Sequence, residues 1–447
     1  MKIRPMTSGS IPGHLLRYCI PAILGNLFQV TYNTVDAVIV GRLVGASALA
    51  AVGIANSLLN IAMFFIIGIG IGASVLMSEF YGAGKLEQLR HELSTAMIAG
   101  AVMSLMLSAA FFAFAKPLLL LCNTPLEILS DVTGYFRIVV GGLLFTLFYN
   151  MLAAALRSIG DTRVPLVCLI IGSVVNILLD LLMVGPMQMG VRGAALATVI
   201  AQAVSAALCA FFLWHDADPL RMRREDFRLD RALLKKTARY SYASALQQAG
   251  VYIGRLLVQS MVNPLGVNAI AAFNAVNRVD DYALIPERDI ANGMMVMTAQ
   301  NRGAKQPQRM MKGLRVGLLM ETVYGCIVSV GVFALAGPLM RLFVGAEETQ
   351  VLSLGTRYLR LMGFFYFMPG ITNGLQGYMR GIGKPALTMY VTYAQMFLRA
   401  LCTFLLIDAM GMDAVPLSCA AGWILMMVWE IGLLIAWRKK DTLTQLE

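Results

Sequence analysis

Charged residues are scarce in this chain. Asp, Glu, Lys and Arg make up 14% of the 447 residues and apolar residues make up 58%, whereas a soluble domain is roughly a quarter charged and half apolar. The mean hydropathy is +0.71. A chain of this composition has too few polar side chains to cover a surface in water, so lipid must surround much of it. This scarcity excludes an ordinary soluble protein.

The chain also lacks the patterns of metal, redox and nucleotide chemistry. Its seven cysteines are scattered singly through apolar segments without a CxxC pair, and its three histidines lie at predicted helix ends or in loops. Metal and redox centres are therefore poorly supported. The sequence has no GxxxxGK[ST] loop to bind ATP, and no HExxH or GxSxG motif. We therefore expect neither an enzyme nor a cofactor, and an ion gradient would have to drive any transport.

Long apolar runs are what the sequence does contain. A membrane-spanning helix needs about 20 apolar residues. Twelve such runs lie near 15–40, 52–79, 94–115, 129–150, 164–186, 193–214, 238–262, 269–300, 314–337, 354–377, 386–407 and 415–437. The first run is long and no small-residue cleavage site follows it, so we expect no cleavable signal peptide. The sequence predicts an all-α polytopic membrane protein with twelve transmembrane helices.

The net charge of +11 comes from loop cations that alternate in number from one side of the membrane to the other. The richer loops carry Lys2 and Arg4, Lys85 and Arg90, Arg157 and Arg163, eight cations between Arg221 and Arg239, five between Arg302 and Arg315, Arg380 and Lys384, and Arg438 to Lys440. The loops between them hold Arg42, Lys116, Arg192 and Arg341. By the positive-inside rule, the richer loops and both termini face the cytoplasm of an inner-membrane protein. The basic excess thus indicates topology, and no nucleic-acid partner is expected.

The sequence repeats itself after about half its length. At an offset of 221 or 223 residues, the matching pairs are Gly45–Ala51 with Gly266–Ala272, Gly82-Ala83 with Gly303-Ala304, and Leu156–Gly160 with Met379–Gly383. Six helices per half make the repeat parallel, about an axis along the membrane normal. We predict an N-terminal six-helix lobe (1–213), a basic cytoplasmic linker (214–239) and a C-terminal six-helix lobe (240–447).

Polar residues of the first half cluster at one predicted depth. Asp36, Asp180 and Thr198 each lie five residues from a glycine at the predicted outer end of their helix, which corresponds to roughly 7.5 Å at 1.5 Å rise per residue. Asn176 lies one turn from Asp180 on the same face. Four oxygen-bearing side chains at one level suit a hard cation such as Na⁺, and a buried carboxyl could equally bind a proton. A coupling site is predicted at Asp36, Asn176, Asp180 and Thr198.

The second half carries more charge at membrane depth. These residues are Arg255, Arg278, Asp280, Asp281, Glu287, Arg288, Asp289, Arg399 and Glu430. Charges inside a membrane must pair or face water, so they form either a structural ion-pair network or the wall of a polar cavity. Pro286 is expected to break its helix and to free backbone carbonyls there. Glu321, near a predicted helix end, is expected to be solvated.

Several motifs resemble the multidrug and toxic compound extrusion (MATE) family over nearly the whole chain. They are Pro21, Asn26, Gln29 and Asp36–Arg42; Gly82–Lys85; Arg157-x-x-Gly160-Asp161-Thr162; Asn176-x-x-x-Asp180; Gln300-Asn301-x-Gly303-Ala304; and Arg380-Gly381-x-Gly383. The acidic pattern is closer to the DinF-like than to the NorM-like branch, because 239–268 and 361–378 contain no Asp or Glu. The resemblance implies cation or proton chemistry at Asp36 and at Asn176-x-x-x-Asp180, with Tyr135 and Pro21 lining that pocket.

The repeat, the buried charges and the resemblance together predict an antiporter. It would export small organic or drug-like molecules in exchange for H⁺ or Na⁺, as a monomer in the lipid bilayer without an ATPase subunit. The predicted substrate pocket comprises Pro21, Gln29, Tyr135, Arg255, Asp280, Glu287, Arg288, Asp289 and Arg399. A flippase for a lipid-linked precursor and a passive channel remain the alternatives.

The charge asymmetry makes the topology testable. Single cysteines are introduced into the 214–239 linker and into the 185–192 loop, and intact cells are treated with a membrane-impermeant thiol reagent. We expect labelling in the loop and none in the linker, because the linker holds eight of the inner-side cations. Labelling in the linker and not in the loop would invert the assigned topology.

Overall fold

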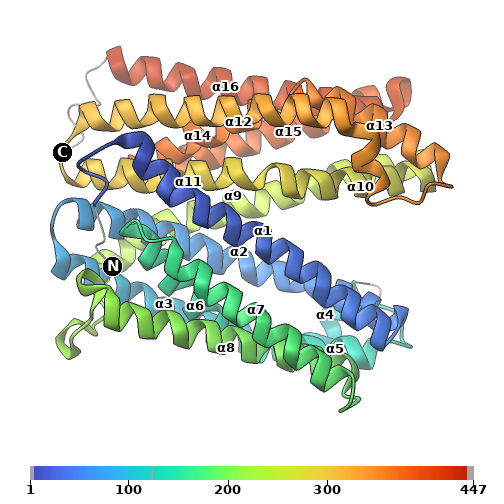
Figure 1. Cartoon of the computed structure of the whole chain (residues 1–447), viewed down its shortest axis with the longest axis horizontal. Helices are drawn as coiled ribbons and strands as arrows, with labels where there is room; N and C mark the ends of the chain where they lie inside the picture. Colours follow the sequence, from blue (N-terminus) through green and yellow to red (C-terminus); the bar gives the residue numbers. More distant parts are fainter. Residues whose placement is uncertain (1–4, 123, 440–447) are drawn as a thin grey trace. The chain divides into compact units, whose positions relative to one another are not determined.

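The structure is a computed structural model that describes residues 5–122 and 124–439. Every element in that part of the chain is helical (Figure 1). Lys2, Arg4 and Lys440, three of the cations assigned to the inner side, lie outside the described residues.

Among the described residues, the first half of the chain contains eight α-helices and the second half contains another eight. The first set is α1 (Ile11–Leu43), α2 (Ala46–Gly82), α3 (Leu86–Ala113), α4 (Ala115–Leu121), α5 (Leu129–Gly141), α6 (Leu143–Ser158), α7 (Arg163–Val184) and α8 (Gly190–Asp216). The second set is α9 (Arg231–Val262), α10 (Val267–Ala283), α11 (Ile285–Gly303), α12 (Pro307–Arg341), α13 (Thr349–Gly363), α14 (Phe367–Gly381), α15 (Pro385–Met410) and α16 (Ala414–Lys439). Short 3₁₀ helices η1 (Asp218–Leu220), η2 (Arg224–Asp226), η3 (Asn263–Leu265) and η4 (Gly411–Asp413) lie in the connections.

Each of the twelve predicted apolar runs coincides with one helix or with a consecutive pair. Among the described residues, six helical stretches are long and apolar enough to cross a membrane, or seven if the bent pair α5 and α6 counts as one span. The remaining runs carry more charge or are interrupted. Helices suit this composition because they satisfy backbone polar groups internally, which lipid cannot do.

Three of the predicted runs are broken near their middle. Helices α5 and α6 meet at Gly142 with a bend of 45°, and α13 and α14 are separated at residues 364–366. These two breaks are repeat-related at an offset of about 223 residues. The third break separates α10 from α11 at Leu284 and puts Pro286 in the first turn of α11. The expected break at Pro286 is thus confirmed, since proline lacks the N–H that a continuous helix would need.

The chain divides into two compact units whose boundaries fall inside helices. One unit contains Ile20–Ala245, and the other contains Met6–Cys19 together with the chain from Leu246 onward. The chain therefore passes from one unit to the other within α1 and again within α9. Residues 231–239 of the predicted linker form the first turns of α9.

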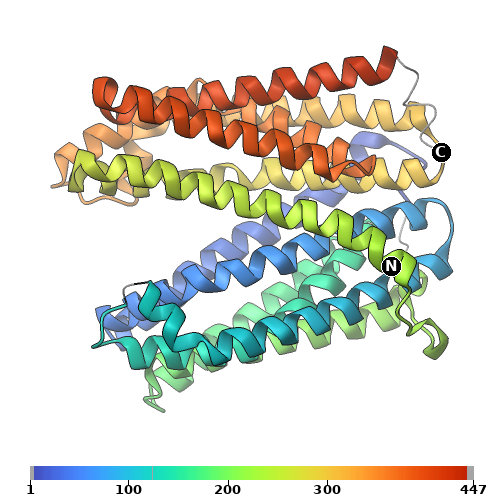
Figure 2. The same cartoon turned by 180° about the vertical axis from the view of Figure 1, so that it is seen from behind.

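Neighbouring helices within each unit pack along their length. In the first unit, α7 runs beside α8, and in the second unit α15 runs beside α16, as both views show (Figure 1 and Figure 2).

Glycines allow the close helix contacts within each unit. In the first unit, an ideal Cβ on Gly72 of α2 would lie 2.4 Å from Ser241 Oγ, and one on Gly68 would lie 2.5 Å from Ala245 Cβ. In the second unit, the repeat-related Gly293 of α11 faces Cys19 of α1, with an ideal Cβ 3.1 Å from its Sγ. Small residues four apart let helix backbones approach closely in a membrane. The start of α9 is thus held on α2, and the start of α1 on α11.

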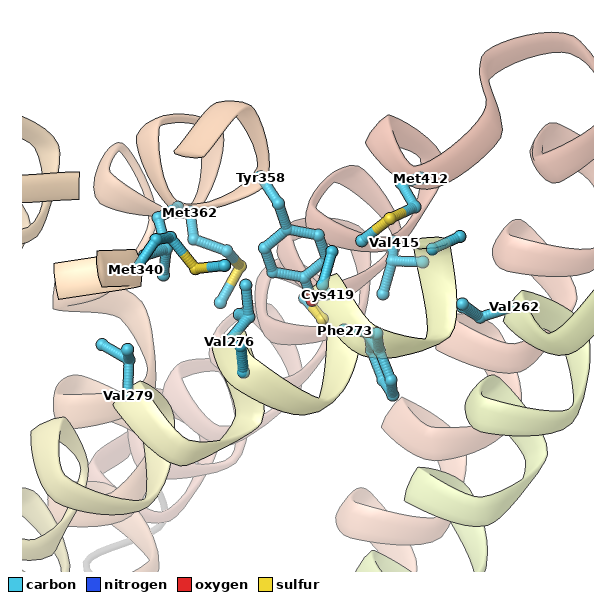
Figure 3. Packing of buried hydrophobic residues seen from close by; sticks show 14 of the residues in the cluster. Val262, Phe273, Val276, Val279, Met340, Tyr358, Met362, Met412, Val415 and Cys419 are labelled. Atoms are coloured by element: carbon cyan, nitrogen blue, oxygen red, sulfur yellow. The ribbon is translucent and has the colours of Figure 1, made fainter. Parts of the chain in front are cut away.

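The second unit also has an apolar core between α10, α13 and the start of α16 (Figure 3). Phe273 and Tyr358 pack edge to face with ring centroids 6.3 Å apart, a preferred aromatic arrangement. Met340, Met362 and Cys419 fill the space around them. This core fixes α10 and so positions the acidic residues that follow it.

The glycine contacts predict different effects for two glycines of the same helix. Gly72→Ala should lower the unfolding free energy by about 1–3 kcal/mol, because the added methyl group overlaps Ser241. Gly53→Ala should be neutral or slightly stabilising, because no atom lies within 4 Å of its ideal Cβ and alanine favours helix. Thermal unfolding of both variants in detergent measures this. Equal midpoints for the two variants would argue against close packing of α2 on α9.

Candidate functional site

Two acidic side chains meet in the first unit, one from α1 and one from α7. The carboxyl groups of Asp36 and Asp180 lie close enough to act on one another directly. Asp180 is fully buried and Asp36 is half-buried. Both oxygens of Asp180 and one of Asp36 are buried without a hydrogen bond of normal geometry within the described residues, although the two carboxyl groups interact with each other. Two carboxylates in a low-dielectric site cannot both stay ionised cheaply, so such a pair is suited to holding a proton or sharing a cation.

One face of α7 carries further buried polar groups next to Asp180. Ser173, Asn176 and Asp180 are all buried and recur at helical spacing, which puts them on one face. Ser173 Oγ and Asn176 Nδ2 also have no hydrogen-bond partner among the described residues. Helix α8 packs close to α7 at Gly172, whose ideal Cβ would lie 1.9 Å from Ser205 Oγ. The sequence prediction included Asn176 and Asp180 but missed Ser173.

Two tyrosines belong to the surroundings of the carboxyl pair. Asp36 and Asp180 both act electrostatically on the hydroxyl groups of Tyr135 from α5 and Tyr32 from α1. Tyr135 was predicted from the family resemblance, whereas Tyr32 was missed. Its position one turn before Asp36 is the sequence signal that would have found it.

Three other predicted residues have different surroundings. Thr198 of α8 is half-buried, and its hydroxyl donates to the Ala194 carbonyl of the same helix at 3.0 Å. Its oxygen keeps lone pairs that can accept a hydrogen bond or bind a cation. Pro21 is buried inside α1 and Gln29 is half-buried further along it.

The chemistry of the carboxyl pair favours light cations. Among the described residues, no group of three or more His, Cys, Asp or Glu side chains could hold a metal ion. Two carboxylates with neutral hydroxyl and amide oxygens are the ligands that hard ions prefer, and thiolate and imidazole ligands of transition metals are missing here. The pair therefore fits a proton or Na⁺.

Six of the nine charges predicted at membrane depth in the second half form two groups. In the first group, Arg255 of α9 pairs with Asp281 of α10, with Nη1 and Oδ1 3.2 Å apart. The neighbouring Asp280 accepts a hydrogen bond from the Tyr366 hydroxyl and interacts electrostatically with Arg255 and Arg399. Positive and negative charges are balanced, which is the arrangement expected of a structural ion-pair network.

The second group consists of acidic side chains that are buried close together. Glu287 of α11 and Glu321 of α12 are fully buried, and none of their four carboxylate oxygens has a hydrogen bond that meets normal geometry within the described residues. Both approach Gly370 of α14, whose ideal Cβ would lie 3.4 Å from Glu321 Oε2 and 3.5 Å from the Glu287 Cδ. Asp289 is buried nearby and acts electrostatically on Glu321. A side chain at Gly370 would intrude between the two carboxyl groups.

Two expectations for this region need revision. Glu321 was expected to be solvated, but it is 0% exposed; α12 begins at Pro307, so Glu321 lies several turns inside its helix. Arg288 was grouped with Glu287 and Asp289, yet it is exposed while both neighbours are buried, because successive helix residues point in directions about 100° apart.

An all-helical membrane protein with buried, unpaired carboxyl groups and a twofold internal repeat has the features of a secondary transporter. Residues 21–182 and 243–405 both match the MatE family model. The two matches cover well over half of the chain, and this chain belongs to the MatE family of transporters. Membership confirms that it is not an enzyme.

Individual relatives are distant but cover most of the chain. The probable multidrug resistance protein YpnP of Bacillus subtilis is 26% identical over 86% of this chain and 85% of its own length. A protein named FAD transporter from Shewanella oneidensis is 27% identical over 82% of this chain and 81% of its own length. A solved structure described as an outward-facing multidrug resistance MATE transporter superposes with a TM-score of 0.92 at 20% identity, covering 99% of each chain. The predicted fold class, two six-helix bundles, is confirmed.

Substitution of Asp280 tests whether the ion-pair network stabilises the fold. Asp280→Asn should lower the unfolding free energy by about 2 kcal/mol, because it leaves Arg399 and Tyr366 without their acidic partner. Arg288→Gln, at an exposed position of the next helix, should stay within about 0.5 kcal/mol of the unmodified protein. Thermal unfolding in detergent compares the two. A stable Asp280→Asn protein would show that these charges are not a structural network.

Proposed function

We propose that this chain is an antiporter that exports small organic or drug-like molecules in exchange for H⁺ or Na⁺. The buried pair of Asp36 and Asp180 carries the proposal, because two carboxyl groups buried next to each other favour binding of a proton or a shared cation. The relatives named as multidrug resistance proteins support the substrate class. The acidic pattern continues to favour the DinF-like branch.

The coupling site is proposed at Asp36, Asn176, Asp180 and Thr198. Helix α7 supplies Asp180 and Asn176 from one buried face, while α1 supplies Asp36 and α8 supplies Thr198. A cation or proton bound between α1 and α7 would favour the conformation in which the two carboxyl groups are close. It can shift the transport equilibrium only by its difference in affinity between two conformations. Loss of one carboxylate should therefore uncouple export from the gradient.

The proposed substrate pocket keeps the remaining predicted residues. In the first half it comprises Pro21, Gln29 and Tyr135. In the second half it comprises Arg255, Asp280, Glu287, Arg288, Asp289 and Arg399. The fully buried carboxyl group of Glu287 supports attraction of cationic molecules there. The Arg255–Asp281 pair holds the neighbouring helices.

We further propose that the protein resides in the cell inner membrane as a monomer with both termini in the cytoplasm. The uneven distribution of loop cations supports this orientation. No ATPase subunit is needed, because the ion gradient supplies the free energy of export.

The coupling site is tested in proteoliposomes with separately imposed Na⁺ and H⁺ gradients. Asp180→Asn should reduce gradient-driven export by about 100-fold or more at normal expression, because it removes the exchangeable charge of the pair. Asp36→Asn should be nearly as severe. Thr198→Ala should be mild if protons drive transport and more damaging if Na⁺ does, since only Na⁺ needs the neutral oxygen ligand.

A matched control is Asp131→Asn, at an exposed position of α5 in the same unit, which should leave export unchanged. Export by Asp180→Asn that still responds fully to an imposed gradient would refute the site. Flux without saturation or gradient coupling in the unmodified protein would favour a channel. Movement of a lipid-linked precursor without drug export would favour a flippase.

A further inference from the structure

A basic cavity of about 420 Å³, open at the surface, lies where the N-terminal segment meets the first turns of α12. Gly9, Ile11 and Pro12 line one side, and Arg309, Lys312 and Arg315 line the other. All six residues belong to the same compact unit. No acidic residue is among the described residues of the lining, so these residues contribute three positive charges and no negative one.

Arg309 builds one wall of this cavity. Its Nε donates to the Met6 carbonyl at 3.0 Å, and its Nη2 donates to the carbonyls of Ser8 and Gly9 at 2.9 Å each. The Met6 N–H in turn donates to Gln300 Oε1 at 2.8 Å. The N-terminal segment is therefore hydrogen-bonded to Gln300 of α11 and to Arg309 of α12. Arg309 thus holds the N-terminal segment in place, and it also lines the cavity with its positive charge.

Unlike Arg309, Lys312 and Arg315 do not hold another part of the described chain by hydrogen bonds. Both side chains are exposed, and neither forms an ion pair or hydrogen bond with the part of the chain that the structure describes. They lie three residues apart, so their charges are neighbours on one helix face. Two adjacent cations without a counter-ion repel each other, and an anion between them would relieve the repulsion.

The internal repeat shows what fills the equivalent place in the first half. Helices α3 and α12 begin at equivalent positions, Leu86 and Pro307, at the offset of 221 residues. Each is preceded by a residue of positive φ, Gly84 at 73° and Lys305 at 54°. The repeat partners of Lys312 and Arg315 are therefore His91 and Ser94.

In the first half, the linker covers this face with a carboxylate. Asp226 Oδ1 lies 3.6 Å from His91 Nε2, and Asp226 Oδ2 lies 3.2 Å from Arg90 Nε. Ser94 Oγ donates to the Arg228 carbonyl at 3.3 Å. An anionic group of the chain itself thus occupies the start of α3. At the start of α12, none of the described residues that line the cavity is acidic, although the positive charge there is larger.

The position of the cavity along α12 indicates a ligand at the membrane boundary. Arg315 is the last cation before a long apolar stretch of a helix that qualifies as a membrane span. Apolar side chains, Ile11 and Val316, line the cavity beside the cations. Basic pockets at this level suit phosphate headgroups, and two adjacent cations match the charge of a phosphate better than that of a single carboxylate.

We propose that this cavity binds a phosphate-bearing ligand, with Lys312 and Arg315 contacting the phosphate and Arg309 holding the N-terminal segment as the opposite wall. The ligand would lie at the start of α12, the position equivalent to the one that Asp226 of the linker occupies at the start of α3. The phosphate can come from a phospholipid headgroup or from a soluble phosphate, and the two sources are separable.

The test uses the full-length protein, delipidated in detergent, with phosphatidylglycerol added in steps and bound lipid counted by native mass spectrometry. The double variant Lys312→Gln/Arg315→Gln should bind roughly 20-fold more weakly, from the contribution of each cation near a phosphate surface. The control Arg231→Gln/Lys235→Gln removes two exposed cations at the start of α9 and should stay within about twofold. The charge-conserving variant Lys312→Arg/Arg315→Lys should retain binding, which shows that the fold tolerates substitution here.

Competition by inorganic phosphate and glycerol phosphate distinguishes the sources. Displacement of the lipid by millimolar phosphate assigns the site to soluble phosphates, whereas lipid binding that resists both assigns it to a headgroup. The proposal is overturned if neither phosphatidylglycerol nor phosphate binds, if the double variant and the α9 control weaken equally, or if the double variant binds as tightly as the unmodified protein.

Discussion

The interior of a membrane cannot satisfy hydrogen bonds, so every polar group that enters it must find a partner within the chain or bring one from outside. This constraint sorts the buried polar residues of the protein into two kinds. Gln247 is of the first kind, with its Nε2 donating to Gln376 Oε1 at 2.7 Å and to Thr392 Oγ1 at 3.0 Å. Such a satisfied cluster holds helices together. Asp180, Glu287 and Glu321 are of the second kind, with carboxylate oxygens that lack a normal hydrogen bond among the described residues.

The same constraint explains why the two halves differ in detail despite a shared plan. Glycines at equivalent places, Gly72 and Gly293, permit equivalent close contacts. The acidic residues are not equivalent: Glu287 and Asp289 correspond to Ile66 and Gly68. The first half places its unpaired carboxyl groups between α1 and α7, whereas the second places them among α11, α12 and α14. The two halves thus share the glycines that allow close helix packing, but they differ in the positions of their buried acidic residues.

Much of the architecture was predictable because it depends on hydropathy, which is read along the chain. All twelve apolar runs coincide with helices or helix pairs, and Pro286 breaks its helix as its covalent structure requires. Residue environments across helices were harder to predict. Asp180 and Asn176 were found because both lie on α7. Tyr32 was missed: its spacing from Asp36 on α1 is local, but its interaction with Asp180 depends on how α1 packs near α7. Glu321 was misjudged since its burial depends on where α12 begins and on the absence of a side chain at Gly370.

The crossing of the chain between units inside α1 and α9 has a consequence for its origin. Met6–Cys19 at the start of the first half belongs to the second unit, and residues up to Ala245 at the start of the second half belong to the first. Each half therefore gives the beginning of its first helix to the other. Two separate copies of one half would have exchanged this segment reciprocally, which is the arrangement of a domain-swapped dimer. Fusion of such a dimer through the basic linker would preserve the exchange, and each unit of the present chain is completed by a segment from the other half of the sequence.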